Sequence, residues 1–168
     1  MPEISDALLI IDLQNGVCTN GKDSLHDLSS LTNLVNNLIE KYQKNRLPII
    51  FIQHSDDELV MNSKSWEIYS EIAAVPDAFY IKKTHANSFY KTNLQELLTD
   101  LPAHSIEICG AQTQFCIDAT IKVAHNLSYE ISMKKNASTT YDNDFMSAEN
   151  TIRFYENIWN NRFLTLYD

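Results

Sequence analysis

Six short apolar runs recur along this chain, and most are separated by longer stretches with helical periodicity. Several runs are apolar at nearly every position instead of alternating with polar residues, which is typical of strands covered on both faces, as in a parallel sheet. Short strands that alternate with helices predict repeated βαβ units. The runs are Ala7–Leu13, Leu47–His54, Phe79–Lys83, Ser105–Ala111, Tyr129–Met133 and Phe163–Tyr167.

The stretches between the runs predict amphipathic helices, because apolar residues recur there three and four positions apart. Six strands linked in this way predict an α/β fold of three layers, a doubly wound parallel sheet of six strands in the Rossmann-like order 3-2-1-4-5-6. No repeat or linker interrupts the pattern, so residues 1–168 are expected to form one domain. The helix candidates are Leu31–Tyr42, Trp66–Ile72, Asn93–Leu101, Ile117–Leu127 and Ser147–Trp159, and polar loops are expected over Val17–Ser30 and Ser55–Lys64.

Charge and composition exclude several classes of partner. The chain carries 13 Lys+Arg against 22 Asp+Glu, a formal net charge of −9. It should repel phosphate backbones and anionic lipids, so neither nucleic acid nor membrane is expected as a partner. The absence of a Gly-x-Gly-x-x-Gly or Walker motif disfavours nucleotide binding. Three cysteines without a Cys-x-x-Cys pair, and an opening without a signal-like segment, predict a cytoplasmic protein with free thiols.

Ligands of open α/β sheets bind beyond the carboxyl ends of the strands, and three candidate catalytic residues fall there. Asp12 and Lys83 end the first and third runs, and Cys116 opens a helix after the fourth. A thiol at a helix N-terminus is expected to favour its thiolate, with Asp12 taking its proton and Lys83 stabilising charge. A helix cap, a solvated lysine and a packed cysteine are the structural alternatives.

Three motifs in order resemble those of the isochorismatase-like cysteine hydrolases. Ala7–Gly16 resembles their opening segment, Lys83 precedes Phe89 by the spacing of their lysine motif, and Gly110–Thr120 resembles their nucleophile loop. Within the family, Gln112–Asp118 is most similar to the streptothricin-hydrolase-like branch. The resemblance covers nearly the whole chain and implies that Asp12, Lys83 and Cys116 are catalytic.

The same resemblance implies hydrolysis of a C–N bond in a small amide, lactam or carbamoyl compound through a cysteine acyl-enzyme. It implies a cis peptide between Ala111 and Gln112, and an oxyanion hole formed by the backbone N–H groups of Gln112 and Cys116. No cofactor is expected. At least a homodimer is implied, with Phe154, Trp159 and Phe163 as candidate contacts, although these residues are equally compatible with core packing.

The pocket wall is less determined. Trp66, Gln14 and Phe115 are candidates for substrate contact, although Trp66 is equally compatible with a core position. No Asp-x-His pair of the nicotinamidase type is found beside His54, so no metal is expected. A role for His54, His85 or Cys18 at the pocket stays open. A binding or regulatory domain without turnover is the main alternative function, and a thiol redox protein is a weaker one.

Overall fold

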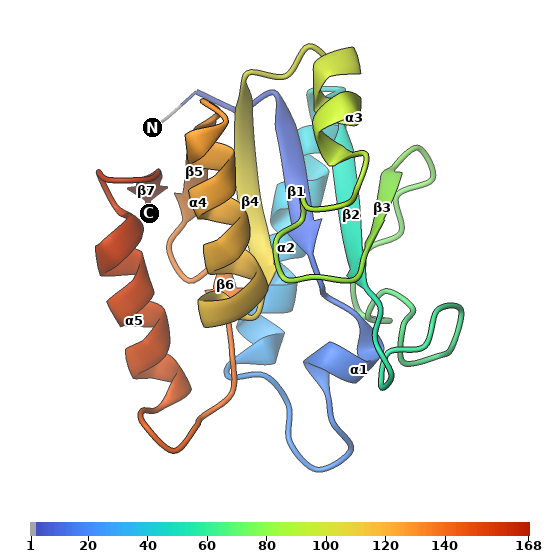
Figure 1. The fold of residues 1–168 in the computed structure, drawn as a ribbon, viewed down its shortest axis with the longest axis vertical. Helices are drawn as coiled ribbons and strands as arrows, with labels where there is room; N and C mark the ends of the chain where they lie inside the picture. The colour runs from blue at the N-terminus through green and yellow to red at the C-terminus, as the bar shows by residue number, and fades with distance from the viewer. Residues whose placement is uncertain (1–2) are drawn as a thin grey trace.

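The computed structural model describes residues 3–168, which form a single three-layer α/β unit (Figure 1). Its parallel sheet has the order β3-β2-β1-β4-β5-β7, which confirms the predicted fold class and strand order. The two-residue strand β6, Ser138–Thr139, pairs with β4 outside this path and was not predicted. The six main strands are β1 (Ala7–Ile11), β2 (Ile49–His54), β3 (Phe79–Lys83), β4 (Ser105–Ala111), β5 (Glu130–Lys134) and β7 (Thr165–Tyr167).

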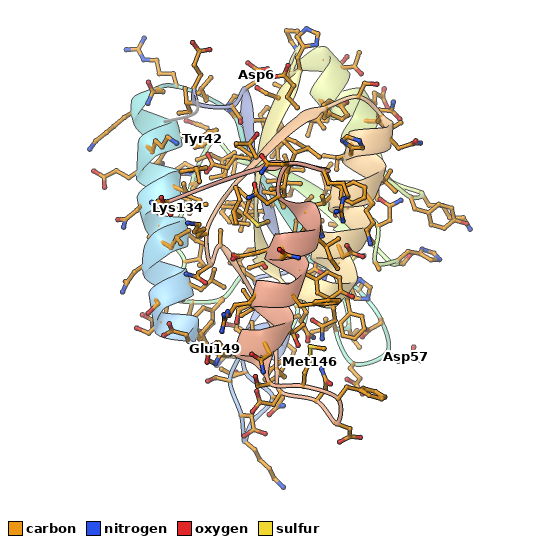
Figure 2. All side chains as sticks on the ribbon, turned by 90° about the vertical axis from the view of Figure 1, so that its left-hand side faces the viewer. Asp6, Tyr42, Asp57, Lys134, Met146 and Glu149 are labelled. Carbon is orange, nitrogen blue, oxygen red and sulfur yellow. The ribbon has the colours of Figure 1, made fainter. Side chains whose placement is uncertain are left out.

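Helices cover both faces of the sheet. The helix α2 covers one face, α3 and α4 cover the other, and α5 lies along the side near β5 and β7 (Figures 1 and 2). None of the helices in residues 3–168 is long and apolar enough to cross a membrane. The helical elements are α1 (Asn15–Cys18), α2 (Leu28–Lys44), α3 (Leu94–Asp100), the π-helical turn η1 (Thr113–Ile117), α4 (Asp118–Asn126) and α5 (Ala148–Trp159).

The strands are buried as their sequences predict. Every residue of β1 is buried, and six of the seven residues of β4 are buried. The edge strand β3 differs, because the side chains of Phe79 and Tyr80 remain exposed there. The continuous apolar runs therefore mark the centre of the sheet, where both faces are covered by helices.

The expected helix over Trp66–Ile72 is wrong. This segment consists of turns, and Ile68 forms an antiparallel bridge with Gln14. Its backbone groups bond to the chain that follows β1: the Tyr69 N–H donates to the Leu13 carbonyl at 2.8 Å, and the Glu67 carbonyl accepts from Asn15. Apolar residues at helical spacing here reflect packing against that chain.

Two other local expectations change in the structure. The predicted loop over Val17–Ser30 contains the end of α1 and the start of α2. Of the three residues suggested for a subunit contact, Phe154 is 52% exposed, whereas Phe163 is half-buried. Trp159 is a core residue with no exposed surface, and its indole N–H donates to Asp118 at 2.9 Å. For Trp159, core packing is therefore correct and the subunit contact is not.

Candidate active site

Four polar side chains meet at the carboxyl edge of the sheet because their strands are neighbours. Asp12 follows β1, His54 ends β2 and Lys83 ends β3, while Cys116 lies in η1, shortly after β4. His54 and Lys83 are paired in the register of β2 and β3. The strand order thus brings together the three predicted catalytic residues and adds His54 between them.

Lys83 is the centre of this cluster. Its side chain is almost fully buried, whereas that of the preceding Lys82 is exposed. The ammonium nitrogen donates to Asp12 Oδ2 at 2.9 Å. It also contacts His54 Nδ1 at 3.0 Å and Cys116 Sγ at 3.2 Å. An ammonium has three N–H donors, so these three acceptors use all of them.

Asp12 is held in an unusual backbone conformation beside this ammonium. Its φ is 52°, in the left-handed region, and its N–H donates to the Ile52 carbonyl at 2.9 Å. The carboxylate is buried, and Oδ1 has no hydrogen-bond partner in the described structure. Burial raises the pKa of Asp12, while the Lys83 ammonium acts in the opposite direction. A buried carboxylate with a raised pKa and a free oxygen is suited to accept a proton.

Cys116 stands in the π-helical turn that leads into α4. Burial, together with the nearby Asp12 carboxylate, raises the pKa of the thiol to about 12. Loss of solvation and the neighbouring negative charge thus act against the thiolate that the helix N-terminus was expected to favour. This raised pKa favours a thiol beside a carboxylate–ammonium pair.

The segment before Cys116 is fixed by close packing. Gly110 has a φ of 132°, and a Cβ there would lie 2.1 Å from the Ile11 carbonyl oxygen, so only glycine lets β4 approach β1 this closely. The peptide between Ala111 and Gln112 is cis. The Gln112 side-chain oxygen accepts a hydrogen bond from Thr140 at 2.9 Å. These contacts hold the turn that carries Cys116 against the end of β1.

His54 forms a second link from the cluster toward the surface. Its Nδ1 accepts from Lys83, which places the ring proton on Nε2, 3.3 Å from Asp56 Oδ2. Burial and the Lys83 ammonium lower the pKa of His54, so the neutral ring is favoured. The predicted strand order indicates this position of His54, because β2 lies between β1 and β3. The last residue of β2 must therefore lie between Asp12 and Lys83.

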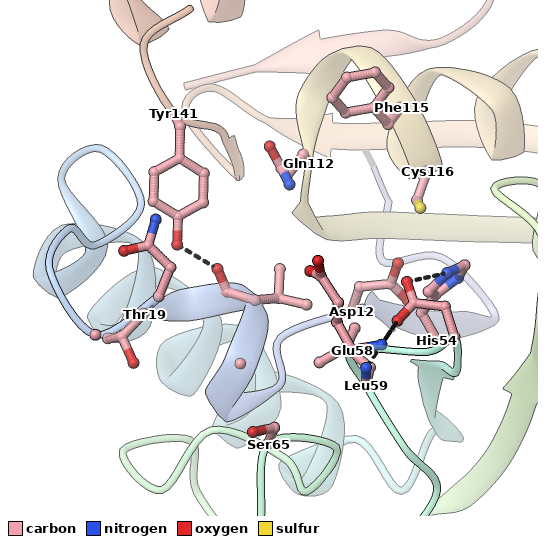
Figure 3. Close-up of a pocket in the computed structure, with 15 residues that line it drawn as sticks. Asp12, Thr19, His54, Glu58, Leu59, Ser65, Gln112, Phe115, Cys116 and Tyr141 are labelled. Carbon is pink, nitrogen blue, oxygen red and sulfur yellow. Dashed lines mark hydrogen bonds and ion pairs between the residues drawn. The ribbon is translucent and has the colours of Figure 1, made fainter.

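A cavity of about 630 Å³ opens above Cys116. Figure 3 shows the Cys116 sulfur pointing toward Asp12 and His54, with Phe115 on the same turn. The other predicted pocket residues lie elsewhere. Trp66 is absent from the lining, and its indole N–H donates to Ser55 at 2.9 Å. The residues around the cavity that the sequence did not indicate include Thr19, Asn20, Gly21, Asp56, Glu58, Leu59, Ser65 and Tyr141.

Gln14, His85 and Cys18 also lie outside this lining. Gln14 is buried, and its amide bonds to the backbone of His54 and to the Trp66 carbonyl, so it positions the end of β2. His85 is exposed and packs edge-on against Tyr90. Cys18 is buried, which raises the pKa of its thiol to about 12.

Asp12, His54 and Cys116 could in principle form a metal site. One ligand atom from each lies within 4.8 Å of the other two, and no further group of this kind occurs in residues 3–168. The Lys83 ammonium is hydrogen-bonded to all three, however. A metal ion at this point would have to displace a cation that already pairs with Asp12, so these residues do not fit a metal.

Comparison with known proteins places this geometry in a family. The isochorismatase domain model matches residues 6–156. An uncharacterized isochorismatase family protein, YddQ of Bacillus subtilis, is 26% identical over 82% of this chain and 79% of its own length. A streptothricin hydrolase of Streptomyces noursei is 22% identical over 81% of this chain. The chain spans about half of that hydrolase, 55% of its length.

A crystal structure of an isochorismatase family protein agrees with the present structure at a TM-score of 0.94. The two chains are 41% identical, and the match covers 96% of this chain and 97% of the other. With the domain match over most of its length, this chain belongs to the isochorismatase family.

Proposed function

We propose that this protein hydrolyses a C–N bond of a small molecule, with Cys116 as nucleophile, Asp12 as general acid and base, and Lys83 as charge stabiliser. The observation that carries the proposal is the position of the Lys83 ammonium, 2.9 Å from Asp12 Oδ2 and 3.2 Å from Cys116 Sγ. Burying a lysine ammonium between a carboxylate and a thiol costs desolvation free energy, which is offset only where the ammonium interacts with negative charge. Developing thiolate is the charge that it can stabilise.

The first half of the reaction forms an acyl-enzyme. Asp12 accepts the Cys116 proton as the sulfur attacks the substrate carbonyl carbon. The carbonyl electrons move onto oxygen, and the backbone N–H groups of Gln112 and Cys116 are the donors that we assign to this oxyanion. When the intermediate collapses, the C–N bond breaks and Asp12 returns its proton to the departing nitrogen. Ammonia or an amine leaves, and a thioester remains on Cys116.

The second half restores the enzyme. Asp12 is then ionised again and can accept a proton from water, whose oxygen attacks the thioester carbonyl. Collapse of this intermediate releases the carboxylic or carbamic acid, and Cys116 regains its proton. The raised pKa of Asp12 supports both roles, since the same carboxyl has to bind a proton and release it in each cycle. Lys83 keeps its proton throughout and stabilises each anionic species in turn.

The cavity limits the class of substrate. A volume of about 630 Å³ accommodates a small molecule and leaves no room for a folded chain beside Cys116. We therefore propose a small amide, lactam or carbamoyl compound as substrate. The similarity to a streptothricin hydrolase is consistent with an amide-type bond.

An ammonia-release screen over a panel of small amides tests the proposal. The wild-type chain should release ammonia from at least one member, and Cys116→Ala should release none. Cys109→Ala is the matched control, because it removes a buried thiol of β4 outside the cavity and should retain activity. Mass spectrometry of acid-quenched wild-type enzyme should detect an acyl adduct on Cys116. Binding without adduct or turnover would favour the alternative of a silent ligand-binding domain.

We also infer a homodimer or larger homo-oligomer in the cytoplasm. The support for assembly is the exposed apolar surface at Phe115, Phe145 and Phe154, which are 56%, 94% and 52% exposed. Aromatic side chains left in water at this level are favourable contacts for a second subunit. The support for the compartment is that Cys18, Cys109 and Cys116 are all free thiols.

A further inference from the structure

The charged side chains that line the cavity are all acidic. Asp12, Asp56 and Glu58 contribute to its wall. Among residues 3–168, no lysine or arginine lines it. The buried Lys83 ammonium lies behind the wall and is hydrogen-bonded to three acceptors of the chain. A ligand in this cavity therefore meets carboxylates without a free cation between them.

Two of these carboxylates keep an uncompensated charge. Asp12 pairs with Lys83, but Asp56 contacts only neutral donors: the His54 ring at 3.3 Å and the N–H groups of Glu58 and Leu59. Those backbone N–H bonds lower the pKa of Asp56, which keeps it ionised. Glu58 is exposed and makes no ion pair within the described residues. The wall thus presents two net negative charges.

The rest of the lining also favours a cation with N–H donors. Phe115 and Tyr141 contribute aromatic rings to the cavity, and such rings attract cations through their faces. Figure 3 shows both side chains beside the cavity, with Asp12 and Glu58 across from them.

We propose that the cavity selects a small amide that carries a positive charge, as an ammonium or guanidinium group near the scissile C–N bond. This inference rests on the proposed hydrolytic function for its reaction, but its charge preference concerns binding alone. A substrate with a carboxylate in the same place would meet Asp56 and Glu58 without a counter-ion. A neutral amide should lie between the two.

The test uses three primary amides of similar length: δ-aminovaleramide, hexanamide and adipamic acid, which are cationic, neutral and anionic at neutral pH. Their affinities for Cys116→Ala are measured by calorimetry, so that turnover is not needed. The expected order is cation, then neutral amide, then anion. The preference for the cation over the neutral amide should fall as salt is raised, because exposed charges are screened.

Two further variants, Glu58→Gln and Glu130→Gln, are each made in the Cys116→Ala protein. They distinguish the effect of a charge in the cavity wall from the effect of the net charge of the whole protein. Both remove one negative charge, but Glu130 is exposed at the start of β5, at the edge of the sheet opposite the carboxyl ends. Glu58→Gln should reduce the preference for the cation roughly threefold to tenfold, as expected for one charge a few ångströms away in a water-like medium. Glu130→Gln should leave that preference unchanged.

Three results would overturn the inference: equal or tighter binding of adipamic acid, no measurable binding of δ-aminovaleramide, or equal effects of the two glutamate variants. Failure of the proposed function is a separate outcome. If the cation binds Cys116→Ala in the expected order but wild-type enzyme releases ammonia from no amide, the charge preference stands and the hydrolytic proposal fails.

Discussion

Replacing Lys83 with methionine should expose the energetic role of the buried pair. Methionine keeps a long unbranched side chain but removes the ammonium, leaving Asp12 only 3% exposed and without its counter-charge 2.9 Å away. Removing one partner of a buried ion pair costs about 3–5 kcal/mol, because the remaining charge is desolvated without compensation. A typical domain has about 5–15 kcal/mol of unfolding free energy, so the variant should fold with a visibly lower urea midpoint.

The pH dependence of this loss identifies its cause. In Lys83→Met the folded-state pKa of Asp12 should rise further above its unfolded value of about 3.9, because the opposing ammonium is gone. The destabilisation should be complete above the folded pKa and should shrink as pH falls from that pKa toward the unfolded value, because the folded state then binds a proton and no longer holds a buried charge. Urea unfolding of wild type and variant at pH values of about 8 and 5 measures the difference.

A double variant provides the matched control. Asp12→Asn combined with Lys83→Met removes both charges at similar volume, and it should recover much of the stability lost in Lys83→Met alone. The reasoning is refuted if Lys83→Met unfolds at the wild-type urea concentration at both pH values. It is equally refuted if the double variant is less stable than Lys83→Met, because the buried charge would then not be the source of the cost.

Four further predictions concern the chemistry and the assembly. Iodoacetamide should modify Cys116 ahead of the buried Cys109, and the rate of modification should rise with pH because burial raises the pKa of the Cys116 thiol to about 12. Mass mapping that places the label on Cys109, with activity retained, would contradict the assignment of Cys116 as nucleophile. Asp12→Asn should lower the single-turnover acylation rate about 10²–10⁴-fold, the usual effect of losing a general base. Adding Lys83→Ala should lower that rate little further, because the two residues act as a unit. If the two rate losses multiply, the residues act independently and the prediction is wrong. The kcat of His54→Gln should exceed that of His54→Leu roughly tenfold or more, because the glutamine amide oxygen can still accept a hydrogen bond from Lys83. Equal kcat values would show that the hydrogen bond at 3.0 Å is unimportant. Light scattering at micromolar concentration should give at least twice the chain mass of 19.3 kDa, whereas a mass of one chain would exclude the proposed dimer.

The sheet could be predicted because each strand leaves a local signature. Ala7–Ile11 is apolar throughout and Ser105–Ala111 is mostly apolar, as is typical of central parallel strands, and right-handed crossovers restrict their order. The positions of Asp12, Lys83 and Cys116 follow from that order. Their protonation states do not, because the pKa values depend on how completely the surrounding side chains exclude water.

The pocket wall could not be predicted for a related reason. Trp66 has the sequence context of a pocket residue, but its orientation is set by the indole bond to Ser55 and by amide bonds to its carbonyl from Gln14 and Gln53. These bonds join the loop that carries Trp66 to other segments, and no periodic pattern in the sequence marks them. The same holds for Asp56 and Glu58, whose place at the cavity depends on a turn closed by their own backbone and side-chain bonds.

The division between strand ends and loops has a consequence for how such an enzyme diversifies. Asp12, His54 and Lys83 belong to the hydrogen-bonded framework of the sheet, so their geometry persists until the domain itself unfolds. Asp56, Glu58 and Ser65 belong to a surface segment with turns in place of ladder bonds. Sequence drift in that segment can therefore exchange one substrate for another while the reacting groups stay in register, which makes the segment 55–65 the natural target for grafting a new specificity.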